Sequence, residues 1–129
     1  KSITLKEGKD IIIFSSGSMV YQSLEAAKIL EKKNISAKVV NMHTIKPIDK
    51  FAIEDACKFK LIVSVEEHNV IGGLGSAIAE HKSSLEKSPK QLILGVKDTY
   101  TKGGSYKFLQ EKHRLTAEKI VEDIISNIS

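Results

Sequence analysis

Apolar residues along the chain fall into short continuous runs, separated by longer stretches in which they recur at helical spacing. Four runs rich in aliphatic, largely β-branched residues span residues 11–14, 37–42, 61–65 and 92–96. Such runs are typical of strands that are buried on both faces of a sheet. Because strands alternate with helices, we predict an α/β fold, a three-layer α/β/α sandwich around a mostly parallel sheet. Residues 3–5 are expected to add a short edge strand.

The predicted helices carry apolar stripes and recognisable end signals. Asp49, Thr116 and Ser18 are expected to cap helix N-termini with their side-chain oxygens. Asn34 suits the left-handed residue that ends a helix. A short helix is also expected from Ser105, after a glycine turn. The stripes are Val20, Leu24, Ala27 and Leu30; Phe51, Ala52 and Ala56; Leu74, Ala77, Ile78, His81 and Leu85; and Ile120, Ile124, Ile125 and Ile128.

Composition narrows the class of protein. The 129 residues fit a single domain, 1–129, and their 41% hydrophobic and 28% charged content is ordinary for a globular protein. No apolar run approaches the roughly 20 residues of a membrane-spanning helix, so no membrane partner is expected. Cys57 is the only cysteine, which predicts a buried, inert thiol and favours a cytoplasmic location. Because the chain starts at Lys1, we expect it to be excised from a longer chain.

The net charge of +4 does not indicate nucleic-acid binding. Of 20 basic residues only Arg114 is an arginine, the residue best suited to bidentate recognition of phosphate or guanine. Aromatic residues make up 5% and there is no Trp, so bases would find few side chains to stack on. We interpret the lysines as a solvated surface.

In sheets of this type, ligands bind beyond the carboxyl ends of the strands. Residues 66–75 form the most distinctive of these loops. Its glycines allow close backbone approach, and the N–H groups at the start of the following helix attract anions. The motif is not a dinucleotide fingerprint, because Ile78 occupies the third glycine position and the glycines do not directly follow the strand. The glycines serve either helix–sheet packing or ligand contact.

Polar residues at the strand ends also have two interpretations. Glu66, Glu67 and His68 form either an acid–base cluster or hydrogen bonds to their own loop or a neighbouring domain. Residues 15–18 form either a phosphate cradle or a helix cap, and His81 is expected to be a packed histidine. No catalytic residue and no metal ligand is assigned. The candidate ligand or interface positions are Ser16, Gly17, Ser18, Glu67, His68, Gly72, Gly73, Gly75 and Ser76.

Four segments in one order resemble the C-terminal domain of transketolase and its thiamine-diphosphate-dependent relatives. They are GKDIIIFSSGSMVYQSLEAAKILEKKNISAKVVNMHTIKPID, the TIKPID loop that closes it, LIVSVEEHNVIGGLGSAIAE and KGGSYKFLQEKHRLTAEKIVEDI. The chain departs from the family at Arg114, where the family often has Gly, and at residues 102–104, which replace a turn that often ends in a single Gly. These departures affect local turn geometry.

The resemblance implies a five-stranded sheet with a short antiparallel first strand at residues 2–6. It also implies that thiamine diphosphate and Mg²⁺ are bound in the parent enzyme by the two preceding domains or by a partner subunit. The Gly-Asp-Gly stretch that binds pyrophosphate in those domains has no counterpart in this sequence. The chain is therefore expected to hold no cofactor, to complete the subunit of a homodimer, and to leave catalysis on a sugar phosphate to the rest of the enzyme.

Relatives with the same pattern remain alternatives. They are 1-deoxyxylulose-5-phosphate synthase and the β subunit of 2-oxoacid dehydrogenases. A non-catalytic ligand-sensing α/β domain is a further alternative of a different class. The sequence upstream of such a domain discriminates among them, because a thiamine-diphosphate enzyme needs pyrimidine- and pyrophosphate-binding domains.

Overall fold

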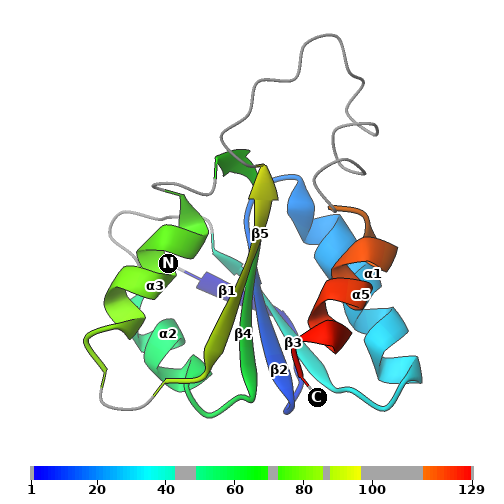
Figure 1. Cartoon of the computed structure of the whole chain (residues 1–129), viewed down its shortest axis with the longest axis horizontal. Helices are drawn as coiled ribbons and strands as arrows, with labels where there is room; N and C mark the ends of the chain where they lie inside the picture. Colours follow the sequence, from blue (N-terminus) through cyan, green and yellow to red (C-terminus); the bar gives the residue numbers. More distant parts are fainter. Residues whose placement is uncertain (1, 43–48, 70–72, 86–87, 97–114, 129) are drawn as a thin grey trace, which may run out of the picture.

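The computed structural model describes residues 2–42, 49–69, 73–85, 88–96 and 115–128. These residues form a five-stranded sheet between two layers of helices (Figure 1). The predicted turn at Gly103 and Gly104 and the helix from Ser105 lie outside the described residues. The elements in chain order are β1 (Ser2–Lys6), β2 (Ile11–Ser15), α1 (Met19–Lys32), β3 (Ala37–Met42), α2 (Lys50–Ala56), β4 (Leu61–Asn69), α3 (Leu74–Lys82), β5 (Lys90–Val96) and α5 (Ala117–Ser126).

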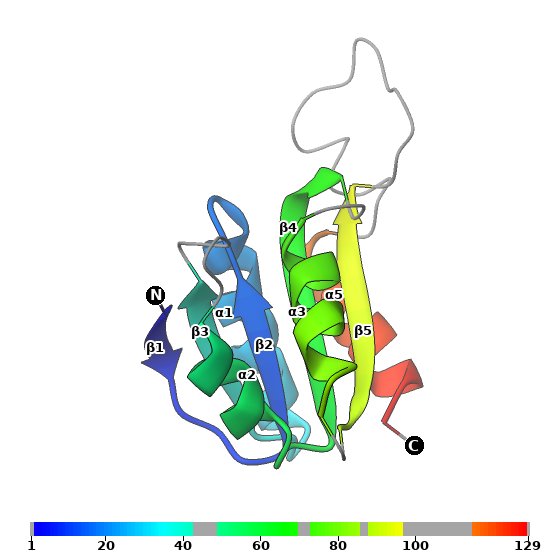
Figure 2. The same cartoon turned by 90° about the vertical axis from the view of Figure 1, so that its left-hand side faces the viewer.

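The strand order is β1-β3-β2-β4-β5 (Figure 2). The four strands from β3 to β5 are parallel, and β1 pairs antiparallel with β3 at one edge. The three-layer fold and the short antiparallel first strand are therefore confirmed. β4 extends four residues beyond the predicted end at Val65, and its register with β5 shifts between Val65 and Asn69.

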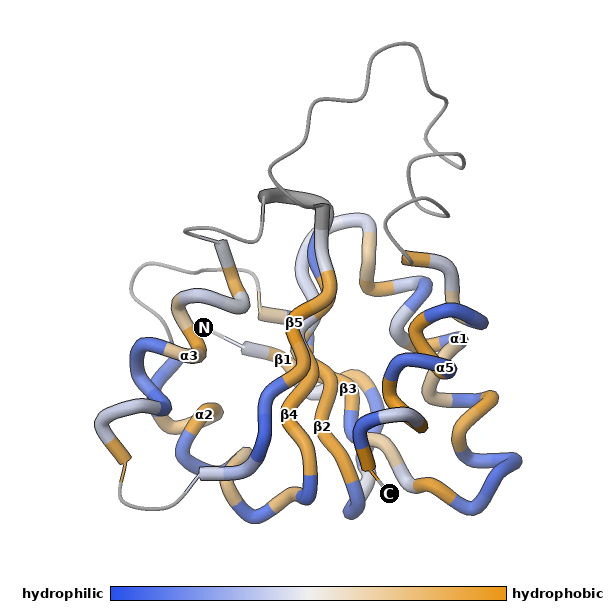
Figure 3. The backbone as a smooth tube through the Cα atoms, viewed as in Figure 1, coloured by the Kyte–Doolittle hydropathy of each residue, from blue (hydrophilic) through white to orange (hydrophobic). Residues whose placement is uncertain are grey.

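Two apolar clusters flank the sheet, one on each face. Helices α1 and α5 cover the first cluster, which includes Ile13 and Val63, and helices α2 and α3 cover the second, which includes Phe14 and Ile62. The residues of β2 are all buried, because helices cover both of its faces. Figure 3 shows the most hydrophobic colours in the central strands.

Three predicted stripes were partly wrong. In α5 the predicted Ile125 is exposed, and Ala117 and Val121 join Ile120 and Ile124 on the buried face. Met19, Ser23 and Ala26 join Ala27 and Leu30 on the buried face of α1, whereas Val20 and Leu24 are half-buried. In α2 the buried residues are Ile53 and Ala56, and Phe51 is 85% exposed. A helix as short as α2 offers few inward positions, and residues three apart in sequence occupy them.

The predicted helix ends were mostly confirmed. Asn34 has a φ of 64° after the end of α1. The Asp49 carboxylate accepts a hydrogen bond from Ala52 N, and the Thr116 hydroxyl accepts one from Lys119 N. Among the described residues, no helix has the length and apolar character needed to cross a membrane.

Candidate functional site at the carboxyl ends of the strands

The topology selects one pair of loops from those that the sequence marks as candidates. β2 and β4 lie side by side and parallel. The chain leaves β2 for α1 on one face of the sheet and reaches α3 on the other face after β4. This reversal is a topological switch point, where open α/β sheets bind ligands. Residues 16–18 and the end of β4 both lie at this edge.

The turn after β2 is tied to its surroundings by buried hydroxyls. Ser23 Oγ donates to Ser15 Oγ at 2.9 Å, and Ser15 Oγ donates to the carbonyl of Val65 at 3.4 Å. Gly17 has a φ of 60°, a conformation that glycine adopts without strain. These bonds hold the first turns of α1 against the end of β4.

Ser18 is the N-cap residue of α1, but the prediction that its side chain caps the helix is wrong. The reason is its backbone conformation. Ser18 is helical, with φ −70° and ψ −11°, whereas a capping residue is usually extended. Asp49 and Thr116, which do cap their helices, have ψ values of 91° and 156°.

Glu66 begins the irregular part of β4, and its side chain turns back into the domain. It is fully buried, and its two oxygens accept hydrogen bonds from Leu74 N at 2.9 Å and Gly75 N at 2.7 Å. The N-cap residue of α3 is Gly73, which has no side chain to cap the helix. Glu66 supplies that cap from the neighbouring strand, and the positive end of the helix dipole stabilises its carboxylate. For this residue, hydrogen bonding within the loop is confirmed.

Gly75 lies where α3 crosses β4 and β5. A Cβ at this position would stand 2.6 Å from Ile93 Cγ2 and 2.8 Å from Ser64 Oγ, closer than side chains tolerate. Gln91 Nε2 donates to the carbonyl of Gly75 at 3.0 Å. The expectation that a glycine of this loop permits tight helix–sheet packing is thus confirmed at Gly75. Ser64 Oγ is buried in this contact and has no hydrogen-bond partner among the residues that the structure describes.

The other candidates are distributed between two faces and the undescribed segments. Ser76 lies half-buried in the first turn of α3, on the opposite face of the sheet from residues 16–18. Glu67 and His68 belong to β4, but their side chains, like Gly72, lie outside the described residues. The fold therefore separates the α1 turn from the α3 glycines.

His81 is a packing residue, as expected, whereas Cys57 is less buried than predicted. His81 Nε2 lies 3.1 Å from Glu54 Oε2 and links α3 to α2. The Cys57 thiol is half-buried, and this burial raises its pKa above the usual value. Neither residue carries the features of a ligand or a nucleophile.

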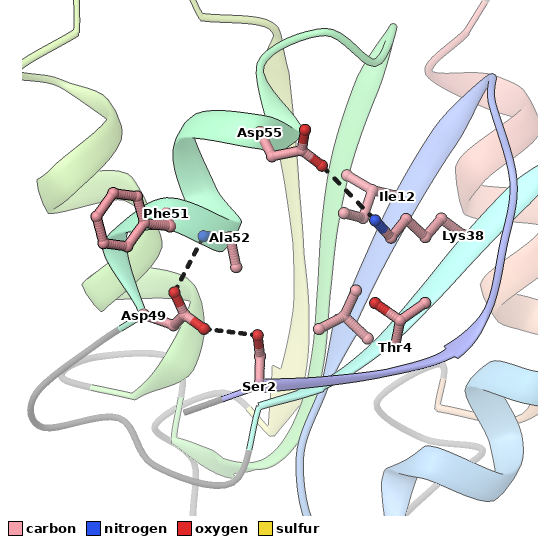
Figure 4. Close-up of a pocket in the computed structure, with 9 residues that line it drawn as sticks. Ser2, Thr4, Ile12, Lys38, Asp49, Phe51, Ala52 and Asp55 are labelled. Atoms are coloured by element: carbon pink, nitrogen blue, oxygen red, sulfur yellow. Dashed lines mark hydrogen bonds and ion pairs between the residues drawn. The ribbon is translucent and has the colours of Figure 1, made fainter.

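A groove of about 230 Å³ between β1 and α2 was not predicted (Figure 4). Asp49 accepts a hydrogen bond from Ser2 Oγ at 2.7 Å, and Lys38 Nζ lies 3.6 Å from Asp55. The Ser2 hydroxyl and the backbone of Ala52 hold the pKa of Asp49 below its usual value. The groove could not be found from sequence, since its walls come from three strands and a helix.

The described residues do not fit a diphosphate bound through Mg²⁺. Such a site uses carboxylates together with phosphate oxygens. Glu66 is the only buried carboxylate among these residues, and both of its oxygens are bonded to α3. Within the same residues no group of three His, Cys, Asp or Glu side chains is placed to hold a metal.

The family of this chain is identified by the match of its sequence to a family model. A family model described as "Transketolase, C-terminal domain" matches residues 1–120. The chain belongs to this transketolase C-terminal domain family. The resemblance of the four sequence segments is thereby confirmed.

Individual relatives agree with the family. The chain is 38% identical over 127 residues to 1-deoxy-D-xylulose-5-phosphate synthase of Dictyoglomus thermophilum, covering 98% of this chain and 21% of the relative. It is 41% identical over 122 residues to the 6-deoxy-6-sulfo-D-fructose transketolase subunit SqwH of Clostridium sp., covering 94% and 38%. A solved structure titled "Split gene transketolase, inactive beta4 tetramer" shares 40% identity with a TM-score of 0.91, covering 99% and 42%.

The transketolase C-terminal domain is thus only part of each of these proteins. The chain spans about one fifth to two fifths of the length of the relatives it matches. The family likeness identifies the domain, and it is compatible with parents of more than one activity.

Proposed function

We propose that this chain is the C-terminal accessory domain of a transketolase, which transfers a two-carbon ketol unit between sugar phosphates with thiamine diphosphate and Mg²⁺. The observation that carries the proposal is the 40% identity to a split gene transketolase over nearly the whole chain. When bound, thiamine diphosphate supplies the carbanion chemistry of such enzymes. In this proposal the cofactor and metal are held by preceding domains or by a partner subunit.

The hydrogen bonds of the buried polar side chains support a non-catalytic, accessory role for the domain. The Glu66 carboxylate caps α3, and the hydroxyls of Ser15 and Ser23 bond to each other and to β4. A carboxylate that accepts two backbone hydrogen bonds is a structural group, since proton transfer would break the cap. We infer that the domain completes the subunit of a cytoplasmic homodimer and that its loops at most border the active site.

A second candidate parent is 1-deoxyxylulose-5-phosphate synthase. It is favoured by the 38% identity to the Dictyoglomus thermophilum enzyme over 98% of this chain. The two parents differ in the donor and acceptor substrates that they use. In the proposal, the binding sites for these substrates lie in other domains.

The parent protein, with its partner subunit if the gene is split, tests the proposal directly. With thiamine diphosphate and Mg²⁺, we expect it to convert xylulose 5-phosphate and ribose 5-phosphate. Condensation of pyruvate with glyceraldehyde 3-phosphate, without transketolase activity, would move the assignment to the synthase. Absence of both activities in a folded, cofactor-loaded parent would contradict both candidates.

The location of the cofactor has its own test. Calorimetry on residues 1–129 with Mg²⁺ should detect no binding of thiamine diphosphate at millimolar concentrations. Tight binding by this chain alone would overturn the accessory role.

A further inference from the structure

The edge strand β1 completes the sheet without joining its core. None of its five residues is buried, and neither of the apolar clusters that the described residues form includes any of them. Ser2 and Thr4 line the polar groove beside α2 (Figure 4), and Ile3 and Leu5 are 51% and 42% exposed. Elements with few buried apolar contacts open at a lower free energy than the core of a domain. The main attachment of β1 is therefore its pairing with β3.

A side-chain hydrogen bond fastens the start of β1 to α2. Ser2 Oγ donates to Asp49 Oδ2 at 2.7 Å, and the other oxygen of the Asp49 carboxylate accepts from Ala52 N at 3.1 Å. Hydrogen bonds to a charged carboxylate are stronger than those between neutral groups. At the other end of β1, Lys6 forms an ion pair with the exposed Glu31 of α1, and such surface pairs contribute little. The bond to Asp49 is thus the stronger of the two side-chain attachments.

The connection from β1 to β2 is anchored separately from β1. Lys9 N donates to Ser36 Oγ at 3.0 Å, and Ser36 N donates to Asp10 Oδ2 at 2.7 Å. A Cβ at Gly8 would lie 2.3 Å from the carbonyl carbon of Ala37, so this glycine packs directly against the backbone of β3. These contacts do not need β1 to be paired, and they place a hinge immediately before Gly8.

We propose that β1 is a strap that detaches from β3 as a unit while the four parallel strands stay folded, and that the hydrogen bond between Ser2 and Asp49 latches it closed. This proposal goes beyond the proposed function and does not depend on it. Detachment removes one wall of the groove and exposes the outer edge of β3. Ile12 and Val40, which line the groove, then become more accessible. The strap thereby controls access to the groove.

Hydrogen exchange of the folded 129-residue chain, followed by NMR in rising sub-denaturing urea, tests whether β1 opens by itself. We expect the protected amides of β1 to exchange at least about 100-fold faster than those of β2. Their rates should depend only weakly on urea, because this dependence scales with the surface exposed by the opening. Exchange of β1 with the rates and urea dependence of β2 would overturn the proposal. So would a β1 without any protection, since the strap would then not be closed.

The latch is tested by removing the hydroxyl of Ser2. Ser2→Ala should accelerate exchange in β1 at least about fivefold, because a hydrogen bond to a carboxylate is lost, and should leave β2 unchanged. Thr4→Val is the matched control, since it removes from the same strand a hydroxyl that is not bonded to Asp49 (Figure 4). It should leave the exchange of both strands unchanged. Equal acceleration by both variants, or none by Ser2→Ala, would overturn the role of Asp49 as the latch.

A disulfide across β1 and β3 tests detachment directly. Ile3 is paired with Asn41, and Cα atoms of such antiparallel pairs lie about 4.5–5.5 Å apart, within the span of a disulfide. In the variant Ile3→Cys/Asn41→Cys, with Cys57→Ala to remove the other thiol, oxidation should slow exchange in β1 to the rate of β2. The reduced form of the same variant is the control and should keep the fast exchange. Circular dichroism verifies folding, and fast exchange of β1 in the oxidised form would overturn the proposal.

Discussion

Glu66 and Gly75 are joined by a hydrogen bond of 2.7 Å from the backbone N–H of Gly75 to the buried carboxylate of Glu66, nine positions earlier in the chain. The other carboxylate oxygen accepts from Leu74 N. The end of β4 and the start of α3 are thus held together by one side chain. Its negative charge lies at the positive end of the helix dipole.

This contact predicts that Glu66→Gln is destabilising although the two side chains have nearly the same shape. A carboxylate accepts both N–H groups, whereas an amide offers one acceptor and turns its own N–H₂ toward the second donor. We expect a loss of about 2–3 kcal/mol in unfolding free energy, measured by urea denaturation. Glu80→Gln, at an exposed position of α3, is the control and should change little. Equal stability of both variants would contradict the capping role of Glu66.

The contact of Gly75 with Ser64 and Ile93 predicts an unusual pair of effects. Gly75→Ala should cost about 1–3 kcal/mol, because the new methyl would lie 2.6 Å from Ile93 Cγ2 and 2.8 Å from Ser64 Oγ. Ser64→Ala should stabilise the domain by about 1 kcal/mol, since it removes a buried hydroxyl that has no partner in the described part of the chain.

Combining the two substitutions measures their coupling. Ser64→Ala removes one of the two close contacts, so the double variant should be more stable than the sum of the single effects predicts. Strict additivity would mean that α3 shifts away from Ser64 when Gly75 is replaced.

Thr116 and Ser18 are the N-cap residues of α5 and α1, and different outcomes are expected when each is replaced by alanine. Thr116→Ala should cost about 1 kcal/mol of stability, because its hydroxyl accepts from Lys119 N. Ser18→Ala should cause no loss of stability through capping, because the side chain of Ser18 does not cap α1. Thermal denaturation of both variants compares them, and an equal loss would indicate that Ser18 supports the helix by another contact.

The Asp49 carboxylate predicts a pH dependence. Its pKa is lowered first by the Ser2 hydroxyl and then by the backbone of Ala52. A lowered folded-state pKa gives stability that is present above the unfolded pKa, near 4, and is lost as pH falls through the folded value. The stability difference between the natural chain and Asp49→Asn should therefore shrink below about pH 4. Ser2→Ala should raise the pKa of Asp49 toward its usual value, as carboxyl NMR titration would detect.

Local signals in the sequence were sufficient for the described strands and helices and for several of their ends. The β-branched run at residues 11–14 predicted β2, because strands buried on both faces have no polar alternation. Asp49, Thr116 and Asn34 were predicted because capping and left-handed conformations involve only neighbouring residues. The four segments that carry the family resemblance were also readable in order, and the family match confirms them.

Only the tertiary structure decided which side chains meet across elements. Nothing near Glu66 in sequence shows that its carboxylate reaches α3, since the bond depends on how β4 and α3 pack. Phe51 and Ile53 are both apolar, and the direction in which α2 lies on the sheet exposes the first and buries the second. The same holds for Gly75 of α3. Its missing Cβ matters because Ser64 of β4 and Ile93 of β5 pack against it. Periodicity sets which residues share a face of one element, but the contact between two faces is set by packing.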